Sequence, residues 1–216
     1  MWRSLTIRSR SWLAGVLFLS SAVSASSAQE FDWKLPLGFP SPKVPANNPM
    51  TNEKVAVGRR LFYDTRLSGN ETFSCASCHK QDQAFTESLE VAVGSTGELH
   101  PRNSMSLTNV AYAATLAWGN PLLRRLEDQI PIPMFGENPV ELGLAGLDDE
   151  LIDRLSADRR YQQLFAAAFP GDTEPINRTN IIRGIASFVR TMISGWKVSL
   201  IEACAQRFAT QPQYAP

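Results

Sequence analysis

One short motif constrains this chain more than any other feature: two cysteines separated by two residues and followed at once by a histidine, in Cys75-Ala76-Ser77-Cys78-His79. This spacing is typical of covalent haem attachment. One helical turn places both sulfurs below the two vinyl-bearing edges of the porphyrin, and the adjoining imidazole lies beneath the iron. The motif predicts one covalent haem c, bound through Cys75 and Cys78, with His79 as the proximal iron ligand.

Two other chemistries use the same residue types. A redox-active dithiol of the thioredoxin kind would lie between a strand and a helix, and a zinc site would need two further Cys or His ligands close by. Outside the motif the chain offers only Cys204 and His100. Because two cysteines are committed to haem and Cys204 has no partner, we expect no structural disulfide and assign Cys204 no role.

The N-terminus has the order of residues found in exported proteins. Arg3, Arg8 and Arg10 precede an apolar run from Trp12 to Leu19, and small residues then lead to Ala28. This order predicts a secretory signal peptide over residues 1–28. The apolar run is too short for a permanent membrane anchor. Because c-type haem is attached outside the cytoplasm in bacteria, we expect the protein in the periplasm.

The charge balance says little about charged partners. The chain has 21 Lys and Arg residues and 21 Asp and Glu residues, and removal of residues 1–28 would leave it slightly acidic. This balance indicates neither a nucleic-acid nor an anionic-membrane partner. The remaining length fits one domain with a substantial core.

Hydrophobic periodicity predicts a mainly α fold with long loops. Residues 29–50 are proline-rich and are expected to form an extended segment. We expect helices at Asn52 to Tyr63 with Thr51 as N-cap, at Pro121 to Ile130 with Asn120 as N-cap, after Asp148 as N-cap, around Tyr161 to Ala168, and at Thr179 to Ile193. We also expect a weak helix or turn at Asn103 to Ala117 and irregular structure from Pro131 to Pro139.

A haem with only His79 as ligand transfers electrons if its sixth position is filled and reacts with small oxidants if it is open. His100, on a glycine-containing loop, Met105 and Met134 are the candidate sixth ligands. Peroxide cleavage also needs a group that takes a proton from one oxygen and returns it to the other. In the polar segment after Gln129, Glu137 and Glu141 are equal candidates by position alone.

Several motifs in a fixed order resemble the N-terminal half of bacterial di-haem cytochrome c peroxidases, from about Leu35 to Gly195. The likeness is greatest to the branch that includes enzymes oxidising protein tryptophan. The motifs are Gly58-Arg59-Arg60-Leu61-Phe62-Tyr63-Asp64, Leu67-Ser68, Ser74 to His79, Ala84-Phe85-Thr86, Pro101-Arg102-Asn103-Ser104 and Asn138-Pro139-Val140-Glu141-Leu142-Gly143.

The resemblance implies a cytochrome c-like haem domain with long loops over residues 51–195, and it implies roles for individual residues. His79 matches the proximal ligand of the haem at which peroxide reacts, and Trp118 matches the tryptophan that lies between the two haems. Asn103 matches an asparagine that helps to hold calcium, an ion that prefers oxygen ligands. Gln129, Pro133 and Glu141 resemble the distal-pocket residues, with Glu141 as the acid–base, and this likeness places Glu141 above Glu137. His100 remains a candidate distal ligand.

The resemblance also implies a second domain with another haem, which residues 196–216 do not contain. We therefore expect a truncated or frameshifted product, in preference to a natural single-haem variant, with one haem, an atypical tail and weak or no donor-dependent turnover. The expected function is reduction of hydrogen peroxide with electrons from a small cytochrome c or cupredoxin. The alternatives are a single-haem electron carrier and a peroxide-dependent oxidase of tryptophan on a partner protein.

Overall fold

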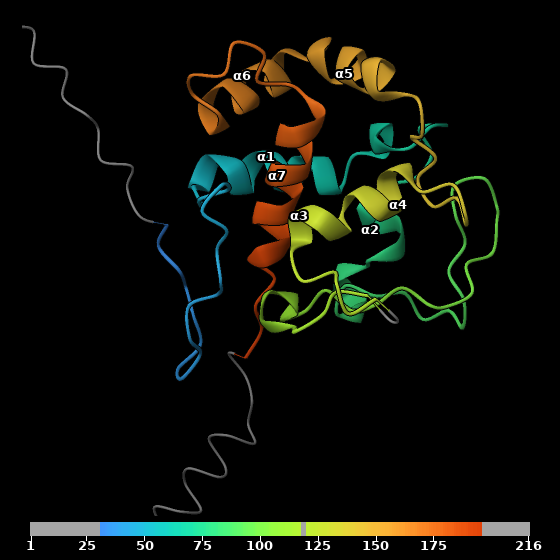
Figure 1. The fold of residues 1–216 in the computed structure, drawn as a ribbon, viewed down its shortest axis with the longest axis horizontal. Coiled ribbons are helices and arrows are strands. Elements are labelled where there is room, and N and C mark those ends of the chain that lie inside the picture. The colour runs from blue at the N-terminus through green and yellow to red at the C-terminus, as the bar shows by residue number, and fades with distance from the viewer. Residues whose placement is uncertain (1–30, 118–119, 196–216) are drawn as a thin grey trace, which may run out of the picture.

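The computed structural model describes residues 31–117 and 120–195. The predicted signal peptide over residues 1–28, Trp118, and the tail over 196–216 with Cys204 lie outside this part of the chain. The described residues form helices, turns and isolated bridges, which confirms the mainly α prediction (Figure 1). The helices are α1 (Asn52–Phe62), η1 (Thr65–Leu67), α2 (Cys75–Cys78), η2 (Gln81–Gln83), η3 (Val110–Tyr112), α3 (Leu126–Gln129), α4 (Pro131–Phe135), α5 (Asp148–Ser156), α6 (Arg159–Ala168) and α7 (Arg178–Arg190).

Helices α1 and α7 cross at the centre of the molecule (Figure 1). Thr51 is the N-cap of α1 as predicted, because its hydroxyl accepts a hydrogen bond from the Lys54 amide at 3.1 Å. The crossing is close at Gly58, where a Cβ atom would lie 1.9 Å from the carbonyl oxygen of Gly184. A side chain at position 58 would therefore force the two helices apart.

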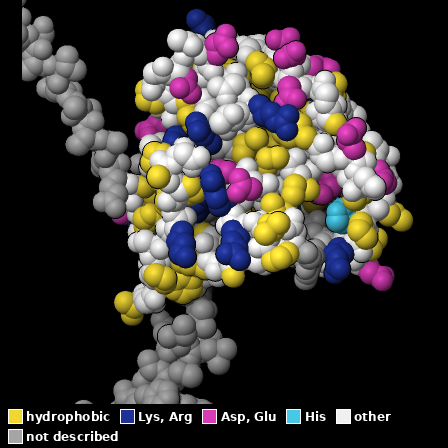
Figure 2. Space-filling model, in the orientation of Figure 1, with side chains coloured by type: hydrophobic (Ala, Val, Ile, Leu, Met, Phe, Trp, Pro, Cys, Tyr) yellow, Lys and Arg dark blue, Asp and Glu magenta, His cyan; other side chains and the backbone are white. Residues whose placement is uncertain are grey.

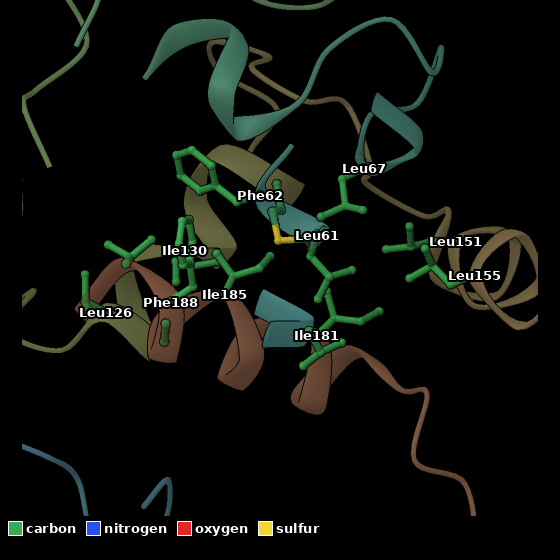
Figure 3. Packing of buried hydrophobic residues seen from close by; sticks show 14 of the residues in the cluster. Leu61, Phe62, Leu67, Leu126, Ile130, Leu151, Leu155, Ile181, Ile185 and Phe188 are labelled. Atoms are coloured by element: carbon green, nitrogen blue, oxygen red, sulfur yellow. The ribbon is translucent and has the colours of Figure 1, made fainter. Parts of the chain in front are cut away.

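The hydrophobic core lies between these two helices and the segments around them (Figure 3). Leu61 and Phe62 of α1 face Ile181 and Ile185 of α7, and Leu126 and Ile130 approach from the side. Helix α6 adds Tyr161 and Phe165, both fully buried; α5 adds Leu151 and Leu155. Burying such side chains stabilises the fold by roughly 1.5–3 kcal/mol each before entropy is counted.

A buried polar cluster joins the N-terminal segment to α1, α3 and α7. Glu127 Oε1 accepts hydrogen bonds from Arg190 Nη2 and Asn48 Nδ2, both at 2.8 Å. Lys54, whose side chain is buried, donates to Asn48 Oδ1 at 3.2 Å and to the Pro49 carbonyl at 2.9 Å. We call these four residues, Asn48, Lys54, Glu127 and Arg190, the buried polar cluster.

The predicted helix from Pro121 to Ile130 is wrong in its first half. Pro121 and Leu122 form a turn, in which Asn120 Oδ1 accepts from the Leu122 amide at 3.0 Å, and α3 begins only at Leu126. The prediction that Pro131 to Pro139 is irregular is wrong over Pro131–Phe135, which form α4, and correct over residues 136–139, which form no helix. Prolines are tolerated in the first turn of a helix, where no amide donor is needed. The predicted N-cap Asp148 is instead the first residue of α5, and Leu147 is the N-cap.

The region from Asn103 to Ala117 contains only the short 3-10 helix η3; its Asn109 N-cap residue has a positive φ of 61°. The glycine-containing loop before it has regular backbone hydrogen bonds. Residues 92–102 form a small hairpin, with a bridge between Val93 and Leu99 and hydrogen bonds that join Ala92 to His100 at 2.8 Å and to Arg102 at 2.9 Å. Among the described residues, no helix has the length and apolar composition needed to cross a membrane.

Candidate haem site

The Cys-x-x-Cys-His motif forms the one-turn helix α2. The Ser77 hydroxyl accepts from the Ser74 amide at 3.0 Å, which starts the helix at Cys75. His79 ends it, and its amide donates to the Cys75 carbonyl at 3.0 Å. Both cysteines and the histidine are therefore delivered by one turn of backbone, as the spacing predicts.

The His79 ring is oriented by a backbone carbonyl. Its Nδ1 atom lies 2.9 Å from the Phe85 oxygen, which can only accept, so Nδ1 carries the proton and Nε2 is the nitrogen available to a metal. Such a contact is typical of histidines that bind iron. Phe85 is presented by a tight loop in which it and Ala84 have φ of 57°. Burial lowers the pKa of His79, which favours the neutral imidazole that ligation requires.

A cavity of about 460 Å³ opens over this motif, a size typical of cofactor pockets. Its floor comes from the central helices, with Phe62 of α1 and Ile185 and Val189 of α7. Its lining is mainly apolar. It includes most of the predicted site residues, namely Cys75, Cys78, His79, His100, Asn103, Met105, Gln129, Pro133, Met134 and Glu141.

The residues of this cavity fit a covalently bound haem. The two thiols and the His79 ring lie at the wall of one apolar hollow. Among the described residues, the Gln129 side-chain oxygen is buried and has no hydrogen-bond partner, as expected of a polar atom that faces a bound group. Cys75 and Cys78 would hold such a haem, and His79 would ligate its iron.

The alternatives to haem find less support here. Burial raises the pKa of Cys75 to about 12 and that of Cys78 to about 11, whereas redox-active dithiols depend on a lowered thiol pKa. Within residues 31–117 and 120–195, no three Cys, His, Asp or Glu side chains gather closely enough to bind a metal ion. The zinc hypothesis therefore finds no further ligands in this part of the chain.

Glu141 and His100 lie together on the cavity wall. Glu141 Oε1 is 3.5 Å from His100 Nε2, and the two side chains are 36% and 26% exposed. Burial raises the pKa of Glu141 above its ordinary 4.5; nearby His100 opposes this effect and Glu87 adds to it. A carboxyl group with a raised pKa, half-buried beside a cofactor cavity, is suited to exchanging protons.

Glycine 94 allows the hairpin to lie against the segment that carries Glu141. A Cβ atom on Gly94 would lie 1.9 Å from the Val140 carbonyl oxygen, so no larger residue fits. The Ser95 amide donates to the Glu141 carbonyl at 2.7 Å, and Glu98 Oε2 accepts from the Val140 amide at 3.1 Å. His100 and Glu141 are thereby brought together although they are far apart in the sequence.

The structure distinguishes Glu137 from Glu141, the two acid–base candidates that sequence position alone left equal. Glu137 is exposed and does not line the cavity, whereas Glu141 does. Gln129 and Pro133 line the cavity because α3 and α4 meet at Ile130. The part of the predicted irregular segment that lines the cavity is therefore helical. Asn103 and Met105 also lie on the cavity wall; calcium binding and ligation of iron by His100 or a methionine stay predictions.

Two groups that act on the site were not predicted from the sequence. The first is the Phe85 carbonyl, which orients His79; a backbone carbonyl is present in every residue, so no sequence pattern distinguishes this one. Glu87 is 5% exposed and accepts from the Ser104 hydroxyl at 2.6 Å. It lies in a polar stretch without periodicity, so no pattern marked it as buried, yet its charge acts on both His79 and Glu141.

This chain is similar in sequence and in fold to known proteins. The family model for di-haem cytochrome c peroxidase matches residues 52–205. Methylamine utilization protein MauG from Methylorubrum extorquens is 34% identical over 163 residues, which cover 76% of this chain and 44% of the relative. Cytochrome-c peroxidase IdrP1 from Denitromonas iodatirespirans is 35% identical over 182 residues, which cover 82% of this chain and 46% of the relative.

A solved structure of a MauG-like protein associated with microbial copper homeostasis superposes with a TM-score of 0.74 and 47% identity, and the match covers 76% of this chain and 47% of that one. The chain thus spans slightly under half the length of these relatives. Membership of the matched family implies binding of haem c, and its named members include oxidoreductases that are cytochrome c peroxidases. This chain belongs to the di-haem cytochrome c peroxidase family.

Proposed function

We propose that this chain supplies the haem at which hydrogen peroxide is reduced to water, with electrons delivered by a small redox protein such as a cytochrome c or a cupredoxin. The observation that supports this most strongly is the position of Glu141. It is a half-buried carboxyl group of raised pKa on the wall of the cavity that contains the haem motif. An electron carrier would have no need of such a group.

The haem, when bound, supplies an iron centre that accepts oxygen ligands and exchanges electrons. The chain supplies the proton transfers. Reduction of one hydrogen peroxide to two waters consumes two electrons from the donor and two protons from solvent. Glu141 as carboxylate accepts the proton of one peroxide oxygen and returns it to the other, which becomes water. The Gln129 side-chain oxygen, which has no partner among the residues that the structure describes, accepts a hydrogen bond from the peroxide and orients it.

The apolar remainder of the cavity limits the entry of water and strengthens the electrostatic contacts inside it. The periplasm, reached through a signal peptide over residues 1–28, is the compartment in which a c-type haem and its small donor proteins meet. One covalent haem is held by the described residues, and Asn103 is the proposed calcium ligand.

The similarity to MauG proteins favours a second candidate within the same chemistry. In it, the oxidising equivalents of peroxide are passed to a tryptophan side chain on a partner protein, with Trp118 as the relay. Both candidates need peroxide to enter the cavity beside Gln129 and Glu141.

Spectroscopy of the ferric protein tests the proposal. The full chain, with its haem attached, is examined by electron paramagnetic resonance and absorption at pH 7. We expect a high-spin ferric iron, five-coordinate or water-bound, that converts to another form when peroxide is added. A strictly six-coordinate low-spin iron in both redox states, inert to peroxide, would instead support the single-haem electron carrier.

A further inference from the structure

We propose that His100 is a positioning residue for Glu141: its Nε2–H group holds Glu141 Oε1, so that the second carboxylate oxygen faces the reacting peroxide. The proposal rests on the proposed function of Glu141 and deepens it. It also gives His100 a role other than ligation of the iron.

The first step of the argument is the tautomer of His100. Its Nδ1 atom accepts a hydrogen bond from the Arg102 amide at 3.3 Å. In a neutral imidazole the nitrogen that accepts carries no proton, so the proton lies on Nε2. Nε2 is the atom that faces Glu141 Oε1, at 3.5 Å. His100 therefore presents a donor to the carboxylate even without a charge.

The second step is the rigidity of the support. The His100 amide donates to the Ala92 carbonyl at 2.8 Å within the hairpin, and the hairpin packs against Val140 through Gly94. A separation of 3.5 Å is an ion-pair distance and slightly long for a hydrogen bond. Contacts of catalytic groups are often long without substrate and tighten when it binds, and a small movement closes this one.

The third step concerns the other charges around Glu141. Glu87, which is held by Ser104, disfavours the carboxylate form of Glu141, whereas His100 favours it. Glu98 lies on the same hairpin but accepts from the Val140 amide, so it fixes the backbone rather than the Glu141 carboxyl group. The His100 side chain is 26% exposed, so its donor is within reach of solvent protons. On the face drawn in Figure 2, charged side chains of both signs lie among apolar ones.

The experiment compares two amides at position 100 in the haem-loaded full chain. In His100→Gln the side-chain nitrogen replaces Nε2 and can still donate to Glu141, whereas in His100→Asn the shorter amide replaces Nδ1 and cannot reach it. Leu99→Ala, on the same hairpin and 65% exposed, is the matched control. The readouts are the second-order rate constant for peroxide and its dependence on pH.

We expect His100→Asn to lower the rate constant by about 10- to 100-fold, since misplacement of a catalytic group has effects of this size. In His100→Asn, the fall of the rate constant on acidification should begin at a higher pH than in the parent protein, because a carboxylate that loses its donor is protonated more easily. His100→Gln should remain within about threefold of the parent protein, and Leu99→Ala should not change it. Equal loss in both His100 variants, or no loss in either, would overturn the proposal.

A second readout does not depend on activity. The chain has two histidines, so the imidazole ¹⁵N resonances of His100 are assigned by comparison with His100→Gln. We expect neutral His100 to carry its proton on Nε2; a proton on Nδ1 contradicts the argument. A change of iron coordination in both His100 variants would show that His100 is an iron ligand and would overturn the proposal. If Glu141→Gln itself leaves the peroxide rate unchanged, the proposed function fails instead.

Discussion

Replacement of Glu141 by Gln should lower the rate constant for reaction of the ferric haem with hydrogen peroxide by about 10²- to 10⁴-fold, the usual contribution of a general acid–base. Gln has nearly the same shape as Glu but cannot accept a proton. Since Glu141 lies on the cavity wall and its carboxyl group contacts His100, the substitution should leave the haem and the fold in place. Stopped-flow absorption of the haem measures the rate.

The exposed Glu137 provides the matched control, because it follows the same α4 helix but does not line the cavity. Glu137→Gln should retain the parent rate. Haem content and the ferric spectrum should be the same in all three proteins. A Glu141→Gln protein that reacts at the parent rate would remove Glu141 from the mechanism.

Replacement of Glu127 by Ala should lower the free energy of unfolding by about 3–5 kcal/mol, because it leaves the Arg190 charge buried without its partner. The side chains of Glu127 and Arg190 are 8% and 3% exposed, and their contact is 2.8 Å long. Denaturant unfolding of the haem-loaded chain measures the change. Asp128→Ala is the control: Asp128 forms an exposed ion pair with Arg125 at 3.7 Å, and its loss should cost under about 1 kcal/mol.

The effect of Glu127 should also depend on pH. Burial by itself would raise the pKa of Glu127, but the hydrogen bonds from Asn48 and Arg190 and the charge of Arg190 outweigh it, so the pKa lies below its ordinary 4.5. A carboxyl group with a lowered pKa in the folded state stabilises the protein above 4.5 and loses that contribution as the pH falls through the folded pKa. The stability difference between parent and Glu127→Ala should therefore be full at neutral pH and shrink below pH 4.5. A difference that is constant across this range would contradict the assignment.

The sequence predicted the haem motif and the long helices because both follow from local spacing. Cys75, Cys78 and His79 must share one turn, and the apolar face of α7 is visible in the order of its residues. The family motif from Gly58 to Asp64 has a structural explanation, since Gly58 permits the close crossing with Gly184 and Asp64 accepts a hydrogen bond from buried Tyr161 at 2.8 Å.

The remaining features depend on contacts between distant segments. The pairing of His100 with Glu141 arises from a hairpin that packs on another loop. The cost of burying Lys54 and Glu127 is offset by hydrogen bonds that they form with Asn48 and, for Glu127, with Arg190. Prolines at positions 131 and 133 indicated an irregular segment, whereas their location in a first helical turn made α4 possible. Contacts between distant segments have no local sequence pattern, so they could not be predicted from the sequence.

The most direct test of the central claim is the second-order rate constant of the parent ferric protein with hydrogen peroxide, compared with that of a haem peptide containing only residues 70–85. The peptide retains Cys75, Cys78 and His79 but lacks the cavity and Glu141. We expect the folded chain to react at least about 100-fold faster than the peptide, and its rate to fall on acidification through a pKa above 4.5, where Glu141 becomes protonated. Equal rates for chain and peptide, or a rate without this acid limb, would contradict the assignment of the cavity as a peroxide site.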